Sequence, residues 1–323
     1  MSIQKIAHLA GVSVATVSRV LNNKNSVKIK NRERVLHAIE QCNYQPNLLA
    51  RQLRTAKSKM LLVLVPDITN SFYASVVRGI ENEAGKNGYS IILNSTDSKK
   101  NNNFPLCLTL LSGKVVDGII TIGSFSNFPD LLSLIGDQPW VQCDIYGDSG
   151  EASVVGIDYY QATRHVFEHF INNGKTRVAL INYGFTGPRE KAYKDVIEEN
   201  GLTFFSISYV NELTFEAGKR AMDYLLQCKN KPDSVFALSD ILAAGVLRSI
   251  QENNLLVPDD ISLVGFGDTE LGFITTPQIS TLKSPAMQIG QEAIKLVMFK
   301  IENPEHPLEK KILDWTFLQR QSS

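Results

Sequence analysis

The chain has 323 residues, and its 33 lysines and arginines equal its 33 aspartates and glutamates, so the formal net charge is zero. The charge is nevertheless divided: the first 60 residues carry about +9, with Glu33 and Glu40 as their only acids, and the remainder carries about −9. A basic segment on an acidic body is typical of a protein that neutralises phosphates with one end. The four cysteines lack CxxC spacing, and GxSxG and Walker sequences are missing, which argues against an enzyme and against metal or organic cofactors.

The basic segment is patterned as short helices. The first has an apolar stripe at helical spacing, formed by Ile3, Ile6, Ala7 and Ala10. Gly11 ends it, because glycine accepts positive φ, and Ser13 caps a second helix over 14–22. A third helix over 29–43 completes a small core. The short turn predicts a helix-turn-helix, with the second helix available for a DNA major groove. A small basic protein-interaction domain is the alternative.

The open face of the second predicted helix carries small, hydroxyl and basic side chains, and its members are Val14, Ala15, Thr16, Ser18, Arg19 and Asn22. Small side chains let a helix approach base edges closely. Thr16 and Ser18 can donate to phosphate, and Arg19 can pair bidentately with guanine. Together with the capping Ser13, these residues form the predicted DNA-contacting set on the helices.

A linker over 46–59 follows the three helices. Pro46 suits the first turn of a helix, but the roughly eight residues that follow are too few for a stable isolated helix in water. We therefore expect this segment to become ordered only in context, as a hinge.

Two stretches of this region together carry a specific resemblance. The run GVSVATVSRVLN over 11–22, followed by YQPN over 44–47, resembles the LacI/GalR family of bacterial transcriptional repressors. The resemblance implies that the linker forms a hinge helix which pairs with its twin in a dimer and wedges Leu53 into the minor groove. It places three more groove-facing positions on Asn47, Ala50 and Arg51. It also assigns the choice of operator sequence to Val14 and Ala15.

The rest of the chain alternates between apolar runs of strand length and helical patterns. Predicted strands cover 60–66, 89–94, 118–122, 140–143, 177–181, 206–210, 234–238 and 262–266. Predicted helices cover 71–87, 104–111, 129–134, 159–173, 188–199, 214–228, 241–253 and 287–301. This alternation predicts an α/β fold with parallel sheets covered on both faces.

The resemblance extends this to a domain plan, with a three-helix head and hinge followed by a two-lobe, periplasmic-binding-protein-like body. We expect the helix-turn-helix domain over 1–45 and the hinge over 46–59. The first lobe would comprise 60–156 and 286–313, and the second 157–285 and 314–323, so each lobe is discontinuous in sequence. A small-molecule effector would bind between the lobes, at the carboxyl ends of strands.

The resemblance assigns the effector site to strand-end and helix-start positions, namely Phe72, Tyr73, Asp144, Arg189, Leu213, Ser239 and Gly267. The aromatic pair would wall the ligand, and Arg189 would clamp its hydroxyls or a carboxylate. Leu213 stands where relatives stack an aromatic ring, and Gly267 stands where many have an aspartate that grips hydroxyls. For each polar residue the alternative is a helix cap.

The resemblance thus implies a dimeric repressor of a carbohydrate-utilisation operon, with double-stranded operator DNA, a small effector and a second copy of the chain as partners. Arg189 in a site without the usual carboxylate favours an acidic or phosphorylated sugar over a neutral one. The alternative is a sugar-binding co-regulator with vestigial DNA binding. The N-terminus lacks the apolar core of a signal peptide, and runs of about 18 apolar residues are missing, so we expect a bacterial cytoplasmic protein on the nucleoid without a membrane partner.

One pair of histidines could either bind a metal ion or lie on a solvated helix surface. His165 and His169 lie four apart on one face of a predicted helix, a spacing that can hold a metal ion. A solvated helix surface is the more frequent interpretation, and we prefer it.

Overall fold

The computed structural model describes residues 2–22, 27–44, 57–95, 104–113, 115–123, 132–133, 135–143, 150–183, 187–203 and 206–323. The chain forms two compact units, the head (1–58) and the body (59–323), which we treat separately. Several predicted site residues lie outside the described ones: Asn47, Ala50, Arg51, Leu53 and Asp144, and the side chain of Asn22. Most of the predicted helix over 129–134 lies outside them as well.

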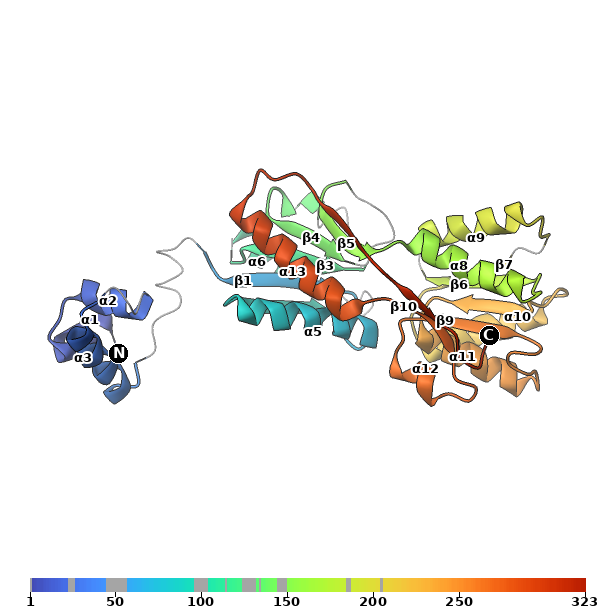
Figure 1. Ribbon diagram of the computed structural model, residues 1–323, viewed down its shortest axis with the longest axis horizontal. Coiled ribbons are helices and arrows are strands. Elements are labelled where there is room, and N and C mark those ends of the chain that lie inside the picture. The colour runs from blue at the N-terminus through green and yellow to red at the C-terminus, as the bar shows by residue number, and fades with distance from the viewer. Residues whose placement is uncertain are drawn as a thin grey trace. The chain divides into compact units, whose positions relative to one another are not determined.

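The described part of the head has three helices, α1 (Ile3–Ala10), α2 (Val14–Asn22) and α3 (Ile29–Gln41) (Figure 1). They enclose a small core of Ile6, Ala7, Ala10, Val17, Val20, Val35 and Ala38. Gly11 ends α1 at φ +59°, and its N–H donates to the carbonyl groups of Ala7 and His8. The predicted apolar stripe, the glycine stop and the three-helix packing are therefore confirmed.

The described residues of the body form two sheets of six strands each. Sheet A has the order β11-β5-β4-β3-β1-β2 and is parallel throughout. Its strands are β1 (Met60–Val65), β2 (Ser90–Ser95), β3 (Gly118–Ile122), β4 (Trp140–Cys143), β5 (Ser153–Ile157) and β11 (Lys310–Leu313). Sheet B has the order β12-β10-β9-β8-β6-β7, and only its edge strand β12 runs antiparallel. Its strands are β6 (Val178–Tyr183), β7 (Ser206–Val210), β8 (Ser234–Ala237), β9 (Ser262–Phe266), β10 (Ser280–Lys283) and β12 (Thr316–Leu318).

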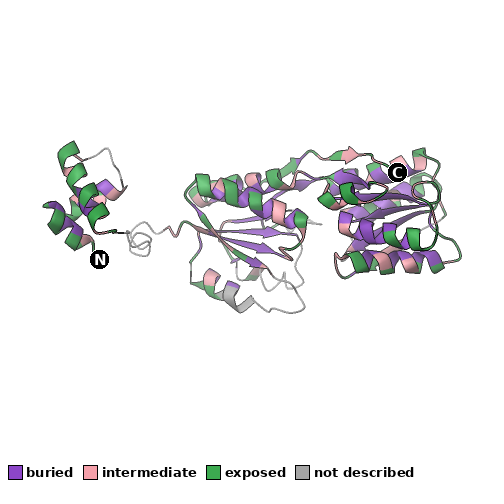
Figure 2. Ribbon diagram, turned by 90° about the horizontal axis from the view of Figure 1, so that it is seen from below, coloured by how far each residue is buried: buried purple, intermediate pink, exposed green. Residues whose placement is uncertain are grey.

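Each sheet with its helices forms one lobe. The first lobe has α5 (Ser71–Lys86), α6 (Phe104–Ser112) and α13 (Ala286–Glu302). The second has α8 (Tyr159–Asn172), α9 (Pro188–Glu199), α10 (Phe215–Gln227), α11 (Asp240–Glu252) and α12 (Glu270–Ile274). Every residue of β3, β5 and β9 is buried, as Figure 2 shows for the inner strands. Burial on both faces explains why these strands are apolar runs without alternation, and the predicted α/β fold is confirmed.

The tightest helix contacts in both lobes depend on glycine. A Cβ at Gly79 of α5 would lie 2.1 Å from the Met287 carbonyl oxygen of α13, and one at Gly290 would lie 2.1 Å from the carbonyl oxygen of Val76. In the second lobe, a Cβ at Gly245 of α11 would lie 2.0 Å from the carbonyl oxygen of Phe215 on α10. These backbones approach closely only because a side chain is missing at the contact.

The chain passes between the lobes at three places. It leaves sheet A after β5 to enter α8, leaves sheet B after β10 to enter α13, and leaves sheet A after β11 to enter β12. The last passage is the dark red segment that runs from one lobe to the other in Figure 1. The apolar-run criterion does not detect β10, β11 and β12. β10 begins with the polar residues Ser280 and Thr281, β11 is largely exposed, and β12 is a three-residue edge strand.

Candidate functional site

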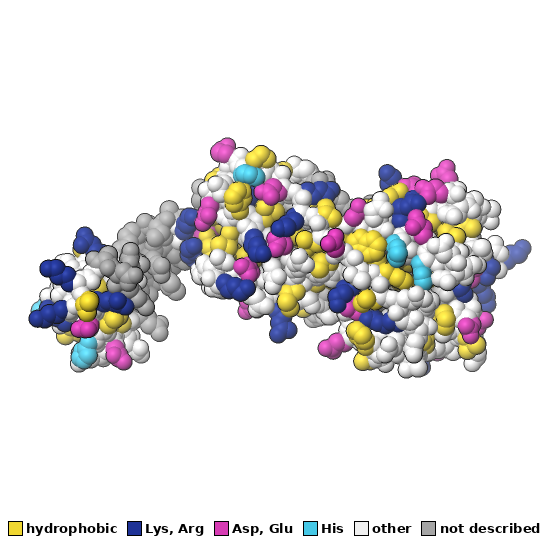
Figure 3. Space-filling view, in the orientation of Figure 1, with side chains coloured by type: hydrophobic (Ala, Val, Ile, Leu, Met, Phe, Trp, Pro, Cys, Tyr) yellow, Lys and Arg dark blue, Asp and Glu magenta, His cyan; other side chains and the backbone are white. Residues whose placement is uncertain are grey.

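The outer face of α2 is open. Val14 is 41 % exposed and Ala15 and Arg19 are exposed, whereas Val17 and Val20 on the opposite face are buried in the core of the head. A helix with a buried apolar face and a small, open outer face can enter a major groove without steric hindrance. Lys and Arg side chains are spread over the visible face of the head (Figure 3).

The start of α2 is fixed by a hydroxyl pair. The Ser13 Oγ accepts a hydrogen bond from the Thr16 backbone N–H at 3.2 Å, so Ser13 is the predicted cap. It also lies 2.9 Å from the Thr16 Oγ1. Both hydroxyl groups therefore stand at the positive end of the helix, where a phosphate is favoured.

In the body, the two lobes meet at an aromatic cluster that contains two of the predicted effector residues. Asn70 caps α5, with its Oδ1 accepting from the Phe72 N–H at 3.0 Å, and this places Phe72 and Tyr73 in the first helical turn. The ring centroids of Phe72 and Tyr73 lie 5.8 Å apart. Across the lobes, the centroid of Phe72 lies 6.1 Å from that of Phe266, the last residue of β9.

Arg189 lies against the same cluster. It stands in the first turn of α9, just after Gly187 and Pro188, and is only 2 % exposed. Its Cζ lies 4.0 Å from the ring centroid of Tyr159 and 4.8 Å from that of Phe266. Both rings hold the guanidinium by cation–π attraction, and its planar donors suit a carboxylate or phosphate.

Sequence reasoning missed two members of this cluster. Neither Tyr159 nor Phe266 is among the predicted effector residues; Tyr159 begins a predicted helix and Phe266 ends a predicted strand. Tyr159 is the first residue of α8, directly after the first passage between the lobes, and its ring centroid lies 6.0 Å from that of Phe266. An aromatic residue beside a lobe passage is the signal that points to this position.

The other predicted effector residues have different surroundings. The Ser239 Oγ accepts from the Leu242 N–H at 3.3 Å and so caps α11, which is the alternative considered for it. Leu213 packs against the second-lobe core. Gly267 has φ +122°, a conformation that side chains rarely adopt, and its N–H donates to the Leu282 carbonyl at 2.8 Å.

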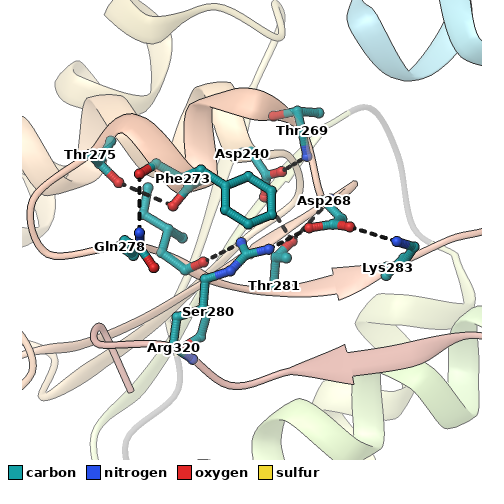
Figure 4. Close-up of polar contacts among 12 residues, drawn as sticks. Asp240, Asp268, Thr269, Phe273, Thr275, Gln278, Ser280, Thr281, Lys283 and Arg320 are labelled. Carbon is teal, nitrogen blue, oxygen red and sulfur yellow. Dashed lines mark hydrogen bonds and ion pairs between the residues drawn. The ribbon is translucent and has the colours of Figure 1, made fainter.

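Two acids near these strand ends are already bound within the second lobe (Figure 4). Asp268 pairs with Arg320 and with Lys283, whose Nζ lies 2.9 Å away. Asp240 accepts from the Thr269 N–H at 2.6 Å and from the Thr281 hydroxyl at 2.8 Å. Burial raises the pKa of the Asp240 carboxyl, and these hydrogen bonds oppose the rise.

The histidine pair of α8 packs on the third lobe passage. The ring centroid of His165 lies 5.4 Å from that of Trp315, and that of His169 lies 4.8 Å from that of Phe317. Burial, followed by the proximity of His165, lowers the pKa of His169. The predicted solvated surface is therefore wrong for His169, which is half-buried. Within the described residues, three metal-binding side chains do not come together anywhere.

The described helices include none that is both long and apolar enough to cross a lipid bilayer.

Comparisons with known proteins agree with this architecture. Residues 2–47 match the model for bacterial regulatory proteins of the lacI family, and residues 167–323 match that for a periplasmic binding protein-like domain. The catabolite control protein A of Priestia megaterium is 34 % identical over 305 residues, which cover 92 % of this chain and 91 % of that protein. HTH-type transcriptional regulator RegA of Clostridium saccharobutylicum is 31 % identical and covers 100 % of this chain and 99 % of its own.

Two solved structures extend the comparison. The lac repressor dimer bound to operator and the anti-inducer ONPF has a TM-score of 0.89 at 22 % identity, over 100 % of this chain and 98 % of that one. A LacI family regulator from Enterococcus faecium with bound ribose has a TM-score of 0.71 at 26 % identity, over 82 % of this chain and 98 % of that one. The relatives from Priestia megaterium and Clostridium saccharobutylicum are transcriptional regulators and not enzymes. With its helix-turn-helix head and two-lobe body, the chain belongs to the LacI family and is a DNA-binding transcriptional regulator.

Proposed function

We propose that the protein is a dimeric repressor of a carbohydrate-utilisation operon whose DNA binding is controlled by an acidic or phosphorylated sugar. One observation carries the effector part: buried Arg189 lies between Tyr159 and Phe266, where Phe72 of the first lobe meets the second. A ligand that binds a cation fixed at the contact between the lobes can change the equilibrium between arrangements of both lobes.

The charges around this position favour an anion. Two carboxylates follow β8 and β9. Asp240 accepts a hydrogen bond from Thr281, and Asp268 forms ion pairs with Arg320 and Lys283. They are therefore not the groups that would grip sugar hydroxyls, whereas the Arg189 guanidinium matches the geometry of a carboxylate or phosphate. The ribose bound to the Enterococcus faecium relative supports a carbohydrate as the ligand class.

The proposed DNA contacts are the cap Ser13 and, on α2, Val14, Ala15, Thr16, Ser18, Arg19 and Asn22. The hinge would add Asn47, Ala50, Arg51 and Leu53. The exposure of Val14, Ala15 and Arg19 supports the first group. Two copies of the chain would read two half-sites of a palindromic operator, since one head reaches only one half-site. Such a protein would act in the cytoplasm, on the nucleoid.

Titration calorimetry with matched ligands tests the effector class. Gluconate and glucose 6-phosphate should bind more tightly than glucose, and tight binding of neutral sugars alone would contradict the proposal. Operator fragments selected from the host genome test the DNA function. A head without operator specificity would show only salt-sensitive affinity that is the same for every sequence.

A further inference from the structure

The turn that follows β9, residues 267–269, is bound at each of its amides. The Gly267 N–H donates to the Leu282 carbonyl at 2.8 Å, and the Asp268 N–H reaches the Thr281 Oγ1 at 3.4 Å. The Thr269 N–H donates to the buried Asp240 carboxylate at 2.6 Å. The turn begins directly after Phe266, which contacts Phe72 and Arg189, so it adjoins the proposed effector site, while the Asp268 side chain is turned to its own ion pairs.

Asp268 adds two ionic contacts to this turn. Its side chain and that of Arg320 are each only 9 % exposed, and Lys283 closes the other side of the carboxylate (Figure 4). Asp268 also has φ +52°, a left-handed conformation that a residue other than glycine keeps only when its surroundings hold it there. The turn is thus held by charge as well as by its backbone.

The two cations lie at the second-lobe ends of the second and third passages, Lys283 at the end of β10 and Arg320 just beyond β12. Lys283 is the last residue of β10, and the chain continues through Ser284 and Pro285 into α13 of the first lobe. Arg320 follows β12, the strand that enters the second lobe from β11 of sheet A. The two passages also lie beside each other, because Lys283 pairs with Thr316 and Leu282 with Phe317.

Arg320 is itself anchored at several points. Its Nη1 donates to the Ile279 carbonyl at 2.8 Å, and its backbone N–H donates to the Ser280 Oγ at 2.8 Å. Its Cζ lies 4.0 Å from the ring centroid of Phe273. A guanidinium held in this way cannot follow Asp268 freely, so movement of the turn must move β10 and β12 with it or break the ion pair.

We propose that Asp268 is a positioning residue for the effector response, which ties the turn after Phe266 to the second and third passages between the lobes through Lys283 and Arg320. Displacement of Phe266 and Gly267 by a ligand is then passed to both passages, and the lobes move together. The inference rests on the proposed function, because a response to effector presupposes one.

Three variants of the full-length protein test this role. Asp268→Asn keeps the shape of the side chain and removes its charge. Lys283→Met removes one cation whose side chain is 53 % exposed, so the fold should tolerate it. Arg248→Met is the matched control: its side chain is 59 % exposed, and it pairs with Glu252 inside α11.

The first measurement is the ratio of operator affinities with and without saturating gluconate or glucose 6-phosphate. This ratio should fall about three- to tenfold in Asp268→Asn and less in Lys283→Met, the size expected for residues that carry coupling. Affinity for the probe and for operator in its absence should stay within about twofold of wild type, and Arg248→Met should match wild type.

The second measurement is hydrogen exchange without DNA or probe. Amides of residues 282–287 and 315–318 should exchange faster in Asp268→Asn than in wild type or Arg248→Met. Unchanged exchange there overturns the proposal, and faster exchange with an unchanged affinity ratio overturns it too, since Asp268 would then only support the fold. A wild-type protein that binds no operator contradicts the proposed function instead, and exchange still decides whether Asp268 braces the passages.

Discussion

The guanidinium carbon of Arg189 lies 4.0 Å from the ring centroid of Tyr159, so a residue of α9 is stacked on the first residue after a passage between the lobes. This contact joins the proposed effector-binding cation to the chain segment that follows the first passage between the lobes. The cation–π attraction also fixes the plane of the guanidinium, which decides the direction from which an anion can approach.

Arg189→Lys tests whether the fixed plane of the Arg189 guanidinium contributes to anion affinity. Lysine keeps the charge but loses the paired donors and the stacking, so affinity for glucose 6-phosphate should fall by about 1.5–3 kcal/mol, the worth of a hydrogen bond to a charged group. Calorimetry measures this loss. Arg164→Lys is the control, because Arg164 pairs with Glu168 and Glu199 on the outside of the second lobe. Equal losses in both variants would show a general effect of arginine removal.

Arg19→Ala tests the open face of α2. If Arg19 pairs with a guanine, its removal should weaken specific operator binding by about 1–3 kcal/mol and relax the preference at one base pair. Gel-shift assays with single-base operator variants check both effects. Lys30→Ala, an exposed charge in α3, should weaken binding to all sequences alike. A uniform loss in Arg19→Ala would assign that residue to phosphate contact.

Gly79→Ala tests the close packing of α5 on α13. The new Cβ would lie 2.1 Å from the Met287 carbonyl oxygen, so the helices must separate, and we expect a loss of about 1–3 kcal/mol in the free energy of unfolding. Denaturant unfolding of the body measures it. Gly85→Ala in the same helix meets no atom within 4 Å and should be neutral or stabilise by about 0.4–1 kcal/mol. A similar effect at both positions would contradict the packing argument.

Asp240 should make the stability of the body depend on pH. Its folded-state pKa is raised above the ordinary 3.8, so its contribution to stability is fully present below pH 3.8 and is lost as the pH rises through the folded pKa. The wild-type free energy of unfolding, less that of Asp240→Asn, should therefore decrease as the pH rises from 3.8. Unfolding titrations of both proteins give this difference. A difference that grows with pH would mean that Thr269 and Thr281 outweigh burial.

The periodic parts of the chain were predictable because local patterns determine them. The stripe of α1 and the strands β3, β4 and β9 match the structure, since residues buried on a helix face or on both sides of a sheet must be apolar. Strands β11 and β12 were not predictable. Their residues are exposed or few, and they pair only because strands distant in sequence are already in place.

The site divides in the same way. The resemblance of the sequence indicated Phe72, Tyr73 and Arg189, and the structure brings these together with Phe266 and Tyr159. The resemblance did not indicate that Lys283 and Arg320 would hold Asp268. Arg320 lies 52 residues after Asp268 in the sequence. An acid at a strand end looks the same in sequence whether it faces a ligand or an arginine.

The sequence by itself determined the family, the three-helix head and the α/β class, because helix periodicity, turn residues and strand hydrophobicity are properties of neighbouring residues. Only the tertiary structure decided which strand ends share an edge, which rings contact Arg189 and which cations pair with Asp268. Those contacts depend on three passages of the chain between two sheets, and the energy of an ion pair or a stacked guanidinium depends on distances that local sequence does not contain.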